Sequence, residues 1–201
     1  MSGRYVITAK NVVFLNPSYP RRNARFQLIF DGKKERVYEN KEALPRAYVV
    51  GEAKIVPQSE DVLETLASEE FDARGMVILE EPAPVLSAQS RATFERSTVT
   101  YRSMLPENVV LEVRTEGDGF LVLTDQYFPG WKAYIDGKPT KIYRANYLFR
   151  AVALPAGQHE IVFRYHPWNF RLGAAISITA ILLIMGYATL PFIRGSRRSQ
   201  T

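Results

Sequence analysis

Hydrophobic and polar positions alternate in short runs along most of the chain, and a turn sequence ends almost every run. The pattern is clearest after residue 92, where Gly-containing turns occur at 116–119, 129–130, 136–137 and 155–157. Short strands with turns every 8–12 residues or so are typical of an antiparallel sandwich. The strands predicted in this part cover residues 93–103, 108–115, 120–127, 131–135, 140–143, 148–154 and 159–166.

The first part of the chain predicts further short strands and one helix. Asp31 and Gly32 form a hairpin turn signal between two of these strands. Residues 59–67 predict a helix, with Ser59 able to cap it and with Glu60 and Asp61 in its first turn. The predicted strands here are 4–8, 11–15, 25–30, 35–38, 47–52 and 75–80.

One segment departs from this alternation. Residues 172–193 contain no charged side chain. As a helix this stretch would be roughly 33 Å long, which matches the hydrocarbon core of a bilayer. It begins only six residues after the last predicted strand, so we expect the preceding domain to lie against the membrane surface.

These patterns predict a mainly β protein. We expect an antiparallel, jelly-roll-like β-sandwich with a minor helix, followed by one C-terminal transmembrane α-helix. The predicted division is a mixed β/α part at 1–86, a sandwich part at 87–170, the transmembrane helix at 171–193 and a basic cytoplasmic tail at 194–201.

Composition and charge exclude several classes of function. The 201 residues include no Cys and only two His, so we expect no metal site, thiol chemistry or cofactor. All 21 acidic residues precede the apolar stretch, whereas three of the 26 basic residues follow it. The net charge of +5 therefore owes much to the Arg tail, and nucleic-acid binding loses its main support.

The orientation of the chain follows from its flanking charges. Arg194, Arg197 and Arg198 favour a cytoplasmic C-terminus and an extracytoplasmic domain. The first ten residues contain no apolar signal sequence, so this orientation requires an earlier membrane segment. We therefore expect a piece or split relative of a larger polytopic protein. A tail-anchored cytoplasmic protein is the alternative.

Three residues are candidates for ligand binding, two at the end of the strand predicted at 120–127 and one in the next strand. Asp125 is a carboxylate beside aromatic residues, which suits sugar binding or acid–base work. A side chain that bonds the backbone of its own turn is the simpler explanation. Tyr127 and Tyr134 could stack on a sugar ring or pack around a core Trp131.

Two further candidates lie in the last third of the chain. Asn146 stands at a turn and tolerates a left-handed backbone conformation. Arg150 lies within a predicted strand, and we expect it to pair with a carboxylate, either Asp125 or Asp136. The sequence assigns no catalytic residue, because glycosidase chemistry requires two facing carboxylates.

Three ordered motifs resemble a known family. They are VYENKEALPRAYVV at 37–50, LVLTDQYFPGWKAYIDG at 121–137 and NYLFRAVALPAGQHEIVFRYHP at 146–167, followed by the apolar stretch. The chain resembles the C-terminal region of the YfhO family of bacterial multi-span membrane proteins. The resemblance implies a relation to glycosyltransferases that take a sugar from a polyprenyl-phosphate carrier on the outer face of the membrane.

The resemblance also implies a limit, because the catalytic acid of such enzymes lies in an early loop that this chain lacks. We expect an accessory, non-catalytic extracytoplasmic domain in a cell-surface glycan system. Its expected partners are the lipid bilayer, a glycan or polyprenyl-linked sugar, and the transmembrane helices of a polytopic partner. The alternatives are a tail-anchored interaction adapter and a membrane-bound glycan hydrolase that uses Asp125.

Overall fold

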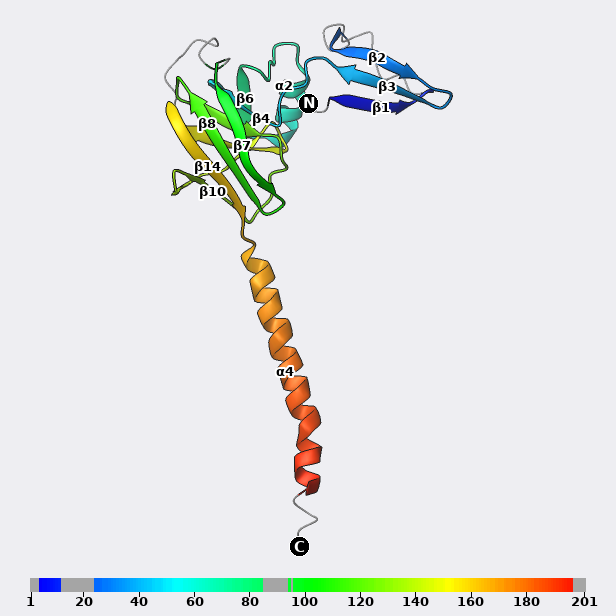
Figure 1. Cartoon of the computed structure of the whole chain (residues 1–201), viewed down its shortest axis with the longest axis vertical. Helices are drawn as coiled ribbons and strands as arrows, with labels where there is room; N and C mark the ends of the chain where they lie inside the picture. The colour runs from blue at the N-terminus through cyan, green and yellow to red at the C-terminus, as the bar shows by residue number, and fades with distance from the viewer. Residues whose placement is uncertain (1–3, 12–23, 85–93, 95, 197–201) are drawn as a thin grey trace.

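A computed structural model describes residues 4–11, 24–84, 94 and 96–196 of the chain. These residues form three β-sheets and the helices α2 (Ser59–Ala67) and α4 (Trp168–Ser196), as Figure 1 shows. Two of the sheets pack against each other, the third projects to one side, and α4 extends from the opposite end of the chain as a long single helix (Figure 1).

The largest sheet has six strands in the order β4-β9-β13-β12-β6-β5. Every residue of β4 and β9 is buried, because both faces of these strands are covered. The face away from the second sheet carries its own cluster, in which Phe120 and Val122 pack with Val77. The strands are β4 (Ala47–Val50), β5 (Glu52–Ile55), β6 (Met76–Leu79), β9 (Gly119–Leu123), β12 (Tyr143–Ala145) and β13 (Phe149–Leu154).

The second sheet has five antiparallel strands in the order β11-β10-β14-β8-β7. Its inward side chains, such as Leu111 and Phe163, meet Leu121 and Val152 of the six-stranded sheet in one buried cluster. The two sheets therefore form a sandwich around this core. The strands are β7 (Thr98–Leu105), β8 (Asn108–Thr115), β10 (Trp131–Ile135), β11 (Lys138–Thr140) and β14 (Gly157–Tyr165).

One strand pair departs from the antiparallel pattern. β5 and β6 are parallel, and α2 supplies the crossover connection that parallel neighbours need. Glu60 and Asp61 lie in the first turn of α2 as predicted, but the cap position is Gln58, with no side-chain bond. The prediction that Ser59 caps the helix is wrong, because its hydroxyl donates instead to the Glu80 carboxylate at 3.0 Å.

The third sheet has three strands in the order β1-β3-β2. β2 and β3 form the hairpin predicted from Asp31 and Gly32, with Asp31 opposite Arg36. The strand predicted at 11–15 lies almost wholly outside the described residues. The strands are β1 (Tyr5–Ala9), β2 (Phe26–Asp31) and β3 (Glu35–Asn40).

The prediction of a mainly β, antiparallel fold with a minor helix is confirmed. The finer jelly-roll arrangement and the division of the chain at residue 86 stay predictions. In space, strands from both sides of residue 86 pair in the six-stranded sheet, for example β4 with β9.

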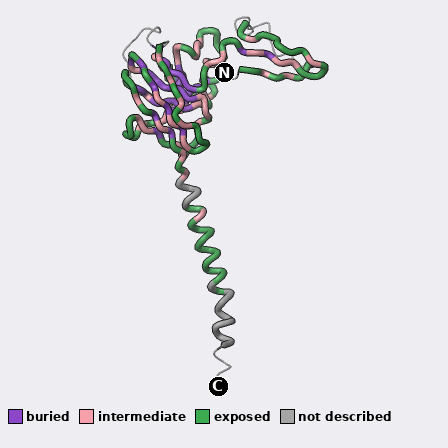
Figure 2. The backbone as a smooth tube through the Cα atoms, in the orientation of Figure 1, coloured by how far each residue is buried: buried purple, intermediate pink, exposed green. Residues whose placement is uncertain are grey.

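Helix α4 follows β14 after only two residues, His166 and Pro167. Its described side chains, 172–185 and Tyr187, are almost all exposed, as the largely exposed upper part of the helix in Figure 2 shows. Within the described residues, no helix combines the length and the apolar character needed to cross a membrane. Trp168, Phe170, Arg171 and the Arg tail have no described side chains.

The turn between β10 and β11 generates a pH-dependent prediction. Asp136 and Gly137 both have positive φ angles, 50° and 76°, as a two-residue hairpin turn requires. The Asp136 carboxylate accepts bonds from His159 Nδ1 at 2.6 Å and from the Glu160 amide at 2.8 Å. The bond to His159, followed by the amide bond, lowers the pKa of Asp136 below its usual value of 3.8.

A group with a lowered pKa in the folded protein stabilises it above the unfolded pKa and loses this effect as the pH falls through the folded value. We therefore expect Asp136→Asn to be less stable than the parent chain near neutral pH. The difference should shrink as the pH falls below about 4. Asn keeps the left-handed turn, so only the charge changes. Urea unfolding at several pH values measures this, and a difference that stays constant with pH would contradict the assignment.

Candidate functional site

The segment 124–130, which connects β9 to β10, carries the first candidate residue. Asp125 follows the end of β9 by two residues, and its side chain is mostly buried. One of its oxygens accepts a bond from Arg46 Nε at 2.6 Å. The other accepts from Arg46 Nη2 and from Arg150 Nη2, both at 2.9 Å. The prediction that Arg150 pairs with a carboxylate is confirmed, and the partner is Asp125.

Arg150 is the largest fully buried side chain of the chain's described part, with 2% of it exposed. Its guanidinium carbon lies 3.9 Å from the ring centroid of Trp131 and 5.4 Å from that of Phe163. Arg150 belongs to the six-stranded sheet, whereas both rings belong to the five-stranded sheet. The cation therefore joins the two sheets, and its attraction to the ring faces offsets part of its desolvation.

The charges in this cluster influence one another. Burial lowers the pKa of Arg150, while the Asp125 charge acts in the opposite direction. The hydrogen bond to Asp125 raises the pKa of the half-exposed Arg46. Burial raises the pKa of the nearby Tyr101 hydroxyl, which has no hydrogen-bond partner among the described residues. We call Arg46, Asp125 and Arg150 the Arg–Asp–Arg cluster.

Sequence reasoning missed Arg46. It lies 79 residues before Asp125 in the chain, and its Nη1 is also 2.7 Å from Met104 Sδ of β7. The only available signal was that Arg46 directly precedes an apolar strand inside the first resembling motif, PRAYVV. An Arg at a strand start has no local partner, so its carboxylate could not be found by spacing.

The two candidate tyrosines do not join the Arg–Asp–Arg cluster. Tyr127 is fixed through its backbone, whose amide donates to the Leu148 carbonyl at 2.6 Å. Tyr134 lies on β10 between Ala133 and Ile135, which face the core, so its ring is on the outer face of the sheet. There it contacts Arg164, whose guanidinium carbon is 6.0 Å from the ring centroid.

Asn146 takes part in a separate set of hydrogen bonds, away from the Arg–Asp–Arg cluster. Its φ angle is 46°, so the predicted left-handed conformation is confirmed. Its Oδ1 accepts from the Ile78 amide, and its own amide donates to the Ile78 carbonyl, both at 2.8 Å. The side chain also hydrogen-bonds with Tyr48, and burial raises the pKa of Tyr48 to about 12. Asn146 thus connects the β12–β13 turn to β6 and β4.

Comparison with known proteins decides the family. The model of the family described as "Bacterial membrane protein YfhO" matches residues 64–177, which is more than half of the chain. The chain belongs to the YfhO family. It is 25% identical over 134 residues to the "Uncharacterized protein YfhO" of Bacillus subtilis (strain 168). The aligned part is 66% of this chain but only 15% of that relative, and no solved structure matches the chain.

The motif FPGW of this YfhO-family chain positions the start of α4. Gly130 has a φ angle of 104°, and its carbonyl accepts from the His166 amide at 2.7 Å. A Cβ on Gly130 would lie 3.0 Å from the Tyr165 ring and 3.4 Å from Pro167 Cα. The residue after it, Trp131, packs its ring 5.3 Å from that of Tyr165. Gly at this position therefore allows the close approach of the segment that leads into α4.

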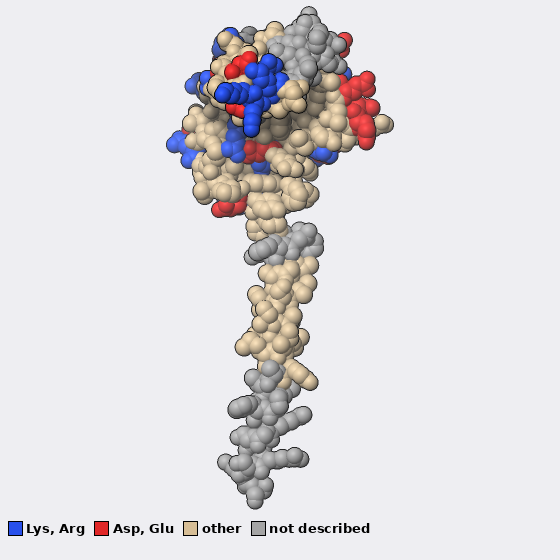
Figure 3. Space-filling view, turned by 90° about the vertical axis from the view of Figure 1, so that its right-hand side faces the viewer, with Lys and Arg blue, Asp and Glu red and all other residues tan. Residues whose placement is uncertain are grey.

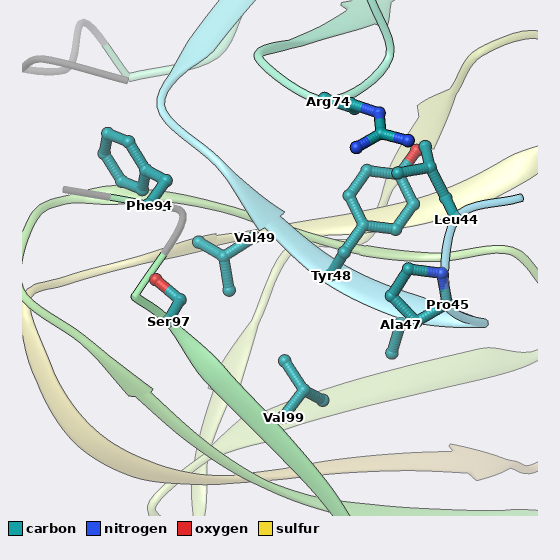
Figure 4. A pocket seen from close by; sticks show the side chains of 9 residues that line it. All are labelled: Leu44, Pro45, Ala47, Tyr48, Val49, Arg74, Phe94, Ser97 and Val99. Atoms are coloured by element: carbon teal, nitrogen blue, oxygen red, sulfur yellow. The ribbon is translucent and has the colours of Figure 1, made fainter. Parts of the chain in front are cut away.

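A pocket of about 340 Å³ lies between the edge strands β4 and β7 (Figure 4). Its lining is mainly apolar, with Arg74 at one side. Residues 85–93, which adjoin Phe94 in the chain, lie outside the described part. Among the described residues, no group of three or more His, Asp or Glu side chains could hold a metal ion. The pocket residues are Leu44, Pro45, Ala47, Tyr48, Val49, Arg74, Phe94, Ser97 and Val99.

The Arg–Asp–Arg cluster predicts a large effect of a small substitution. Asp125→Asn removes the negative charge between two guanidiniums, one of them buried. We expect the free energy of unfolding to fall by about 3 kcal/mol, because a buried charge is left without its counter-charge. Denaturant titration of the full chain in detergent, followed by tryptophan fluorescence, measures this.

Two further variants separate the effects of burial and of charge on the free energy of unfolding. Arg46→Gln should cost less than about 1 kcal/mol, because Arg46 is half exposed. In the double variant Asp125→Asn/Arg150→Met the buried charge is gone, and part of the lost stability should return. Unchanged stability of Asp125→Asn would show that the cluster does not support the sandwich.

Gly130 generates the second prediction for this site. Gly130→Ala places a Cβ in a left-handed conformation and against the Tyr165 ring, so we expect a loss of about 1–3 kcal/mol. Gly75→Ala is the matched control, because a Cβ there meets nothing within 4 Å. The same unfolding titration measures both variants, and equal stability of the two would refute the packing argument.

Proposed function

We propose that this chain is a membrane-anchored, extracytoplasmic β-domain that serves a YfhO-like glycosyltransferase system for cell-surface glycans. In this system the sugar comes from a polyprenyl-phosphate carrier, and the chain itself does no chemistry. The observation that carries the proposal is the family match, which runs from α2 through the sandwich into the first part of α4. The domain and the start of the helix therefore belong to one unit that recurs in a family of membrane proteins.

The anchor in this proposal is α4. Its sequence has no charge from 172 to 193, and its described side chains present large apolar groups to the outside. Among them Leu183, Ile184 and Tyr187 are about 70% exposed or more. Soluble helices bury such groups, so lipid or other membrane helices are the surroundings that suit this surface. A division into 1–86, 87–170, 171–193 and 194–201 follows from this proposal.

The charges after the apolar stretch indicate how α4 would be oriented across the membrane. Residues 194–201 contain three Arg and no acid, which favours the cytoplasmic side. The sandwich then lies outside the membrane on the other side, where lipid-linked sugars and glycans are handled. An earlier membrane segment or a polytopic partner would have to deliver the domain there.

A non-catalytic role fits the contacts of Asp125. Three guanidinium N–H groups bind its two oxygens, and the charge belongs to a structural cluster. Glycoside hydrolysis requires a second carboxylate across a cleft, and the partners of Asp125 are cations instead. This weakens the alternative of a hydrolase based on Asp125. Tyr127 and Tyr134 remain the candidates for contact with a glycan.

A partner helix is part of the proposal. A Cβ on Gly173 in α4 would meet nothing within 4 Å, so the helix backbone is open to close approach there. Small residues at such positions let a second membrane helix pack against the first. The other helices of a multi-span partner are the natural occupants, together with the bilayer.

Topology in intact cells tests the proposal. Because the chain has no Cys, Lys138→Cys creates one labelling site in the exposed β10–β11 turn region. We expect an impermeant maleimide to label it from outside, while a reporter fused after Thr201 is active only in the cytoplasm. Ile181→Cys is the control and should react only after detergent is added.

The opposite orientation would favour the tail-anchored adapter and overturn the proposal. Purified chain should also fail to transfer sugar from a polyprenyl-phosphate donor. Transfer by this chain alone would contradict the non-catalytic role, whatever its orientation.

A further inference from the structure

Three large apolar side chains are exposed at the end of the sandwich from which α4 emerges. Met104 and Leu105 lie at the end of β7, and Phe128 lies in the segment 124–130. They are exposed by 51%, 52% and 55%. Figure 3 shows that the surface of the domain next to α4 is mostly uncharged on the visible face, apart from one acidic patch at its lower edge. We call these three residues the apolar rim.

Strand register places the apolar rim beside the helix. Leu105 pairs with Asn108, and Asn108 pairs with Arg164, four residues before α4. The Tyr165 amide donates to the Glu107 carbonyl at 2.8 Å, which brings the β7–β8 turn level with the end of β14. Phe128 is two residues from Gly130, whose carbonyl binds the His166 amide. Both parts of the rim therefore lie around the root of α4.

The position of Phe128 follows from fixed contacts. The segment that carries it is tied at Asp125 to Arg46 and Arg150, and at the Tyr127 amide to the Leu148 carbonyl. Met104 is likewise in contact with Arg46. These contacts hold the rim in place, and yet its large apolar groups remain in contact with solvent in the isolated domain, which is unfavourable.

The opposite end of the sandwich has a different character. The turn between β8 and β9 contains Glu116, Gly117 and Asp118, and Asp118 accepts a bond from the Ala156 amide. β14 begins there with the exposed Gly157 and Gln158. The apolar rim is thus specific to the end next to α4.

Two cations lie on the five-stranded sheet in the same register row as Leu105 of the apolar rim. Lys132 of β10 and Arg164 of β14 are directly opposite each other, and both are exposed. Neither forms an ion pair within the described part of the chain. Like charges in directly opposite positions are unfavourable in an antiparallel pair unless an anion lies between or beside them. Asn108 pairs with Leu105 and also with Arg164, so both cations are level with Leu105 along the strands.

We infer that the end of the domain next to α4 docks on an anionic lipid surface. Met104, Leu105 and Phe128 enter the interface of the leaflet, and Lys132 and Arg164 face its headgroups. This inference rests on the proposed function of α4 as the membrane anchor. An apolar rim with cations beside it is the arrangement that binds such an interface.

Single cysteines in the full chain test this docking. Leu105→Cys and Phe128→Cys report on the rim, Gln158→Cys reports on the opposite end, and Ile181→Cys reports on α4. Each variant is labelled with an environment-sensitive fluorophore and reconstituted in phosphatidylcholine vesicles with about one third phosphatidylglycerol and a trace of nitroxide lipid. We expect blue-shifted, nitroxide-quenched emission at 105, 128 and 181, and water-like emission at 158.

The outcomes separate this inference from the proposed function. If position 181 is quenched and both rim positions behave like position 158, the anchor stands and the docking is refuted. If position 181 is also unquenched, α4 is not in the bilayer, and both proposals fail.

A charge variant tests the headgroup contact. Lys132→Gln/Arg164→Gln should reduce quenching at position 128 several-fold in anionic vesicles, and should change it little in pure phosphatidylcholine. Lys138→Gln, on the exposed β10–β11 hairpin, is the matched control. Equal quenching in the parent and the double variant would refute the contribution of these cations.

Discussion

The carboxylate of Asp125 between two guanidiniums is the interaction on which one whole end of the sandwich depends. It fixes the segment 124–130 against the start of β4 and holds Arg150 over Trp131 of the other sheet. Trp131 in turn packs on Tyr165, the last residue of β14. The charge pair, the aromatic stack and the strand end therefore form one continuous path from the core to the root of α4. Loss of the Asp125 charge would therefore disturb the packing at the start of α4, although Asp125 and α4 are not in contact.

The Arg–Asp–Arg cluster gives the aromatic and acidic residues of the motif TDQYFPGW a structural role. Asp, Tyr and Trp close together in a sequence suggest a sugar site, because carboxylates and ring faces bind sugars. In the folded chain the Trp131 face is occupied by the Arg150 cation, and the Asp125 oxygens are occupied by Arg46 and Arg150. Tyr134 lies on the outer face of the five-stranded sheet, away from this cluster. The contacts of Asp125 and Trp131 are therefore explained by the structure alone, without a sugar ligand.

Local pattern predicted the regular elements well and the long-range contacts poorly. α2, β8 and β10 begin and end at the predicted residues, because their alternation and turn signals are complete within the element. The strand predicted at 120–127 ends already at Leu123, since the chain leaves the sheet there to bring Asp125 to Arg46. The strand predicted at 47–52 divides at Gly51, where a Cβ would overlap the ring of Phe94. The Asp125–Arg150 pair could be predicted because a cation within a strand needs a nearby carboxylate. The role of Arg46 and the parallel pairing of β5 with β6 could not, because both depend on segments that only the folded chain brings together.

The short connection between β14 and α4 limits how the domain can move relative to the helix. Backbone hydrogen bonds from the Tyr165 and His166 amides continue the sheet to within two residues of α4. The next residue, Pro167, has its φ angle fixed by its ring and lies within contact range of Gly130. A single membrane helix with a flexible linker would leave a domain free to tilt and turn. In the docking inferred above, the apolar rim at the β7–β8 turn and Phe128 would give the domain a second line of support on the same end as the helix. A domain that is held by a helix and also by a rim at a separate point cannot tilt freely. It would present the outer face of the five-stranded sheet, with Tyr134 and Arg164, at a constant angle and height above the membrane.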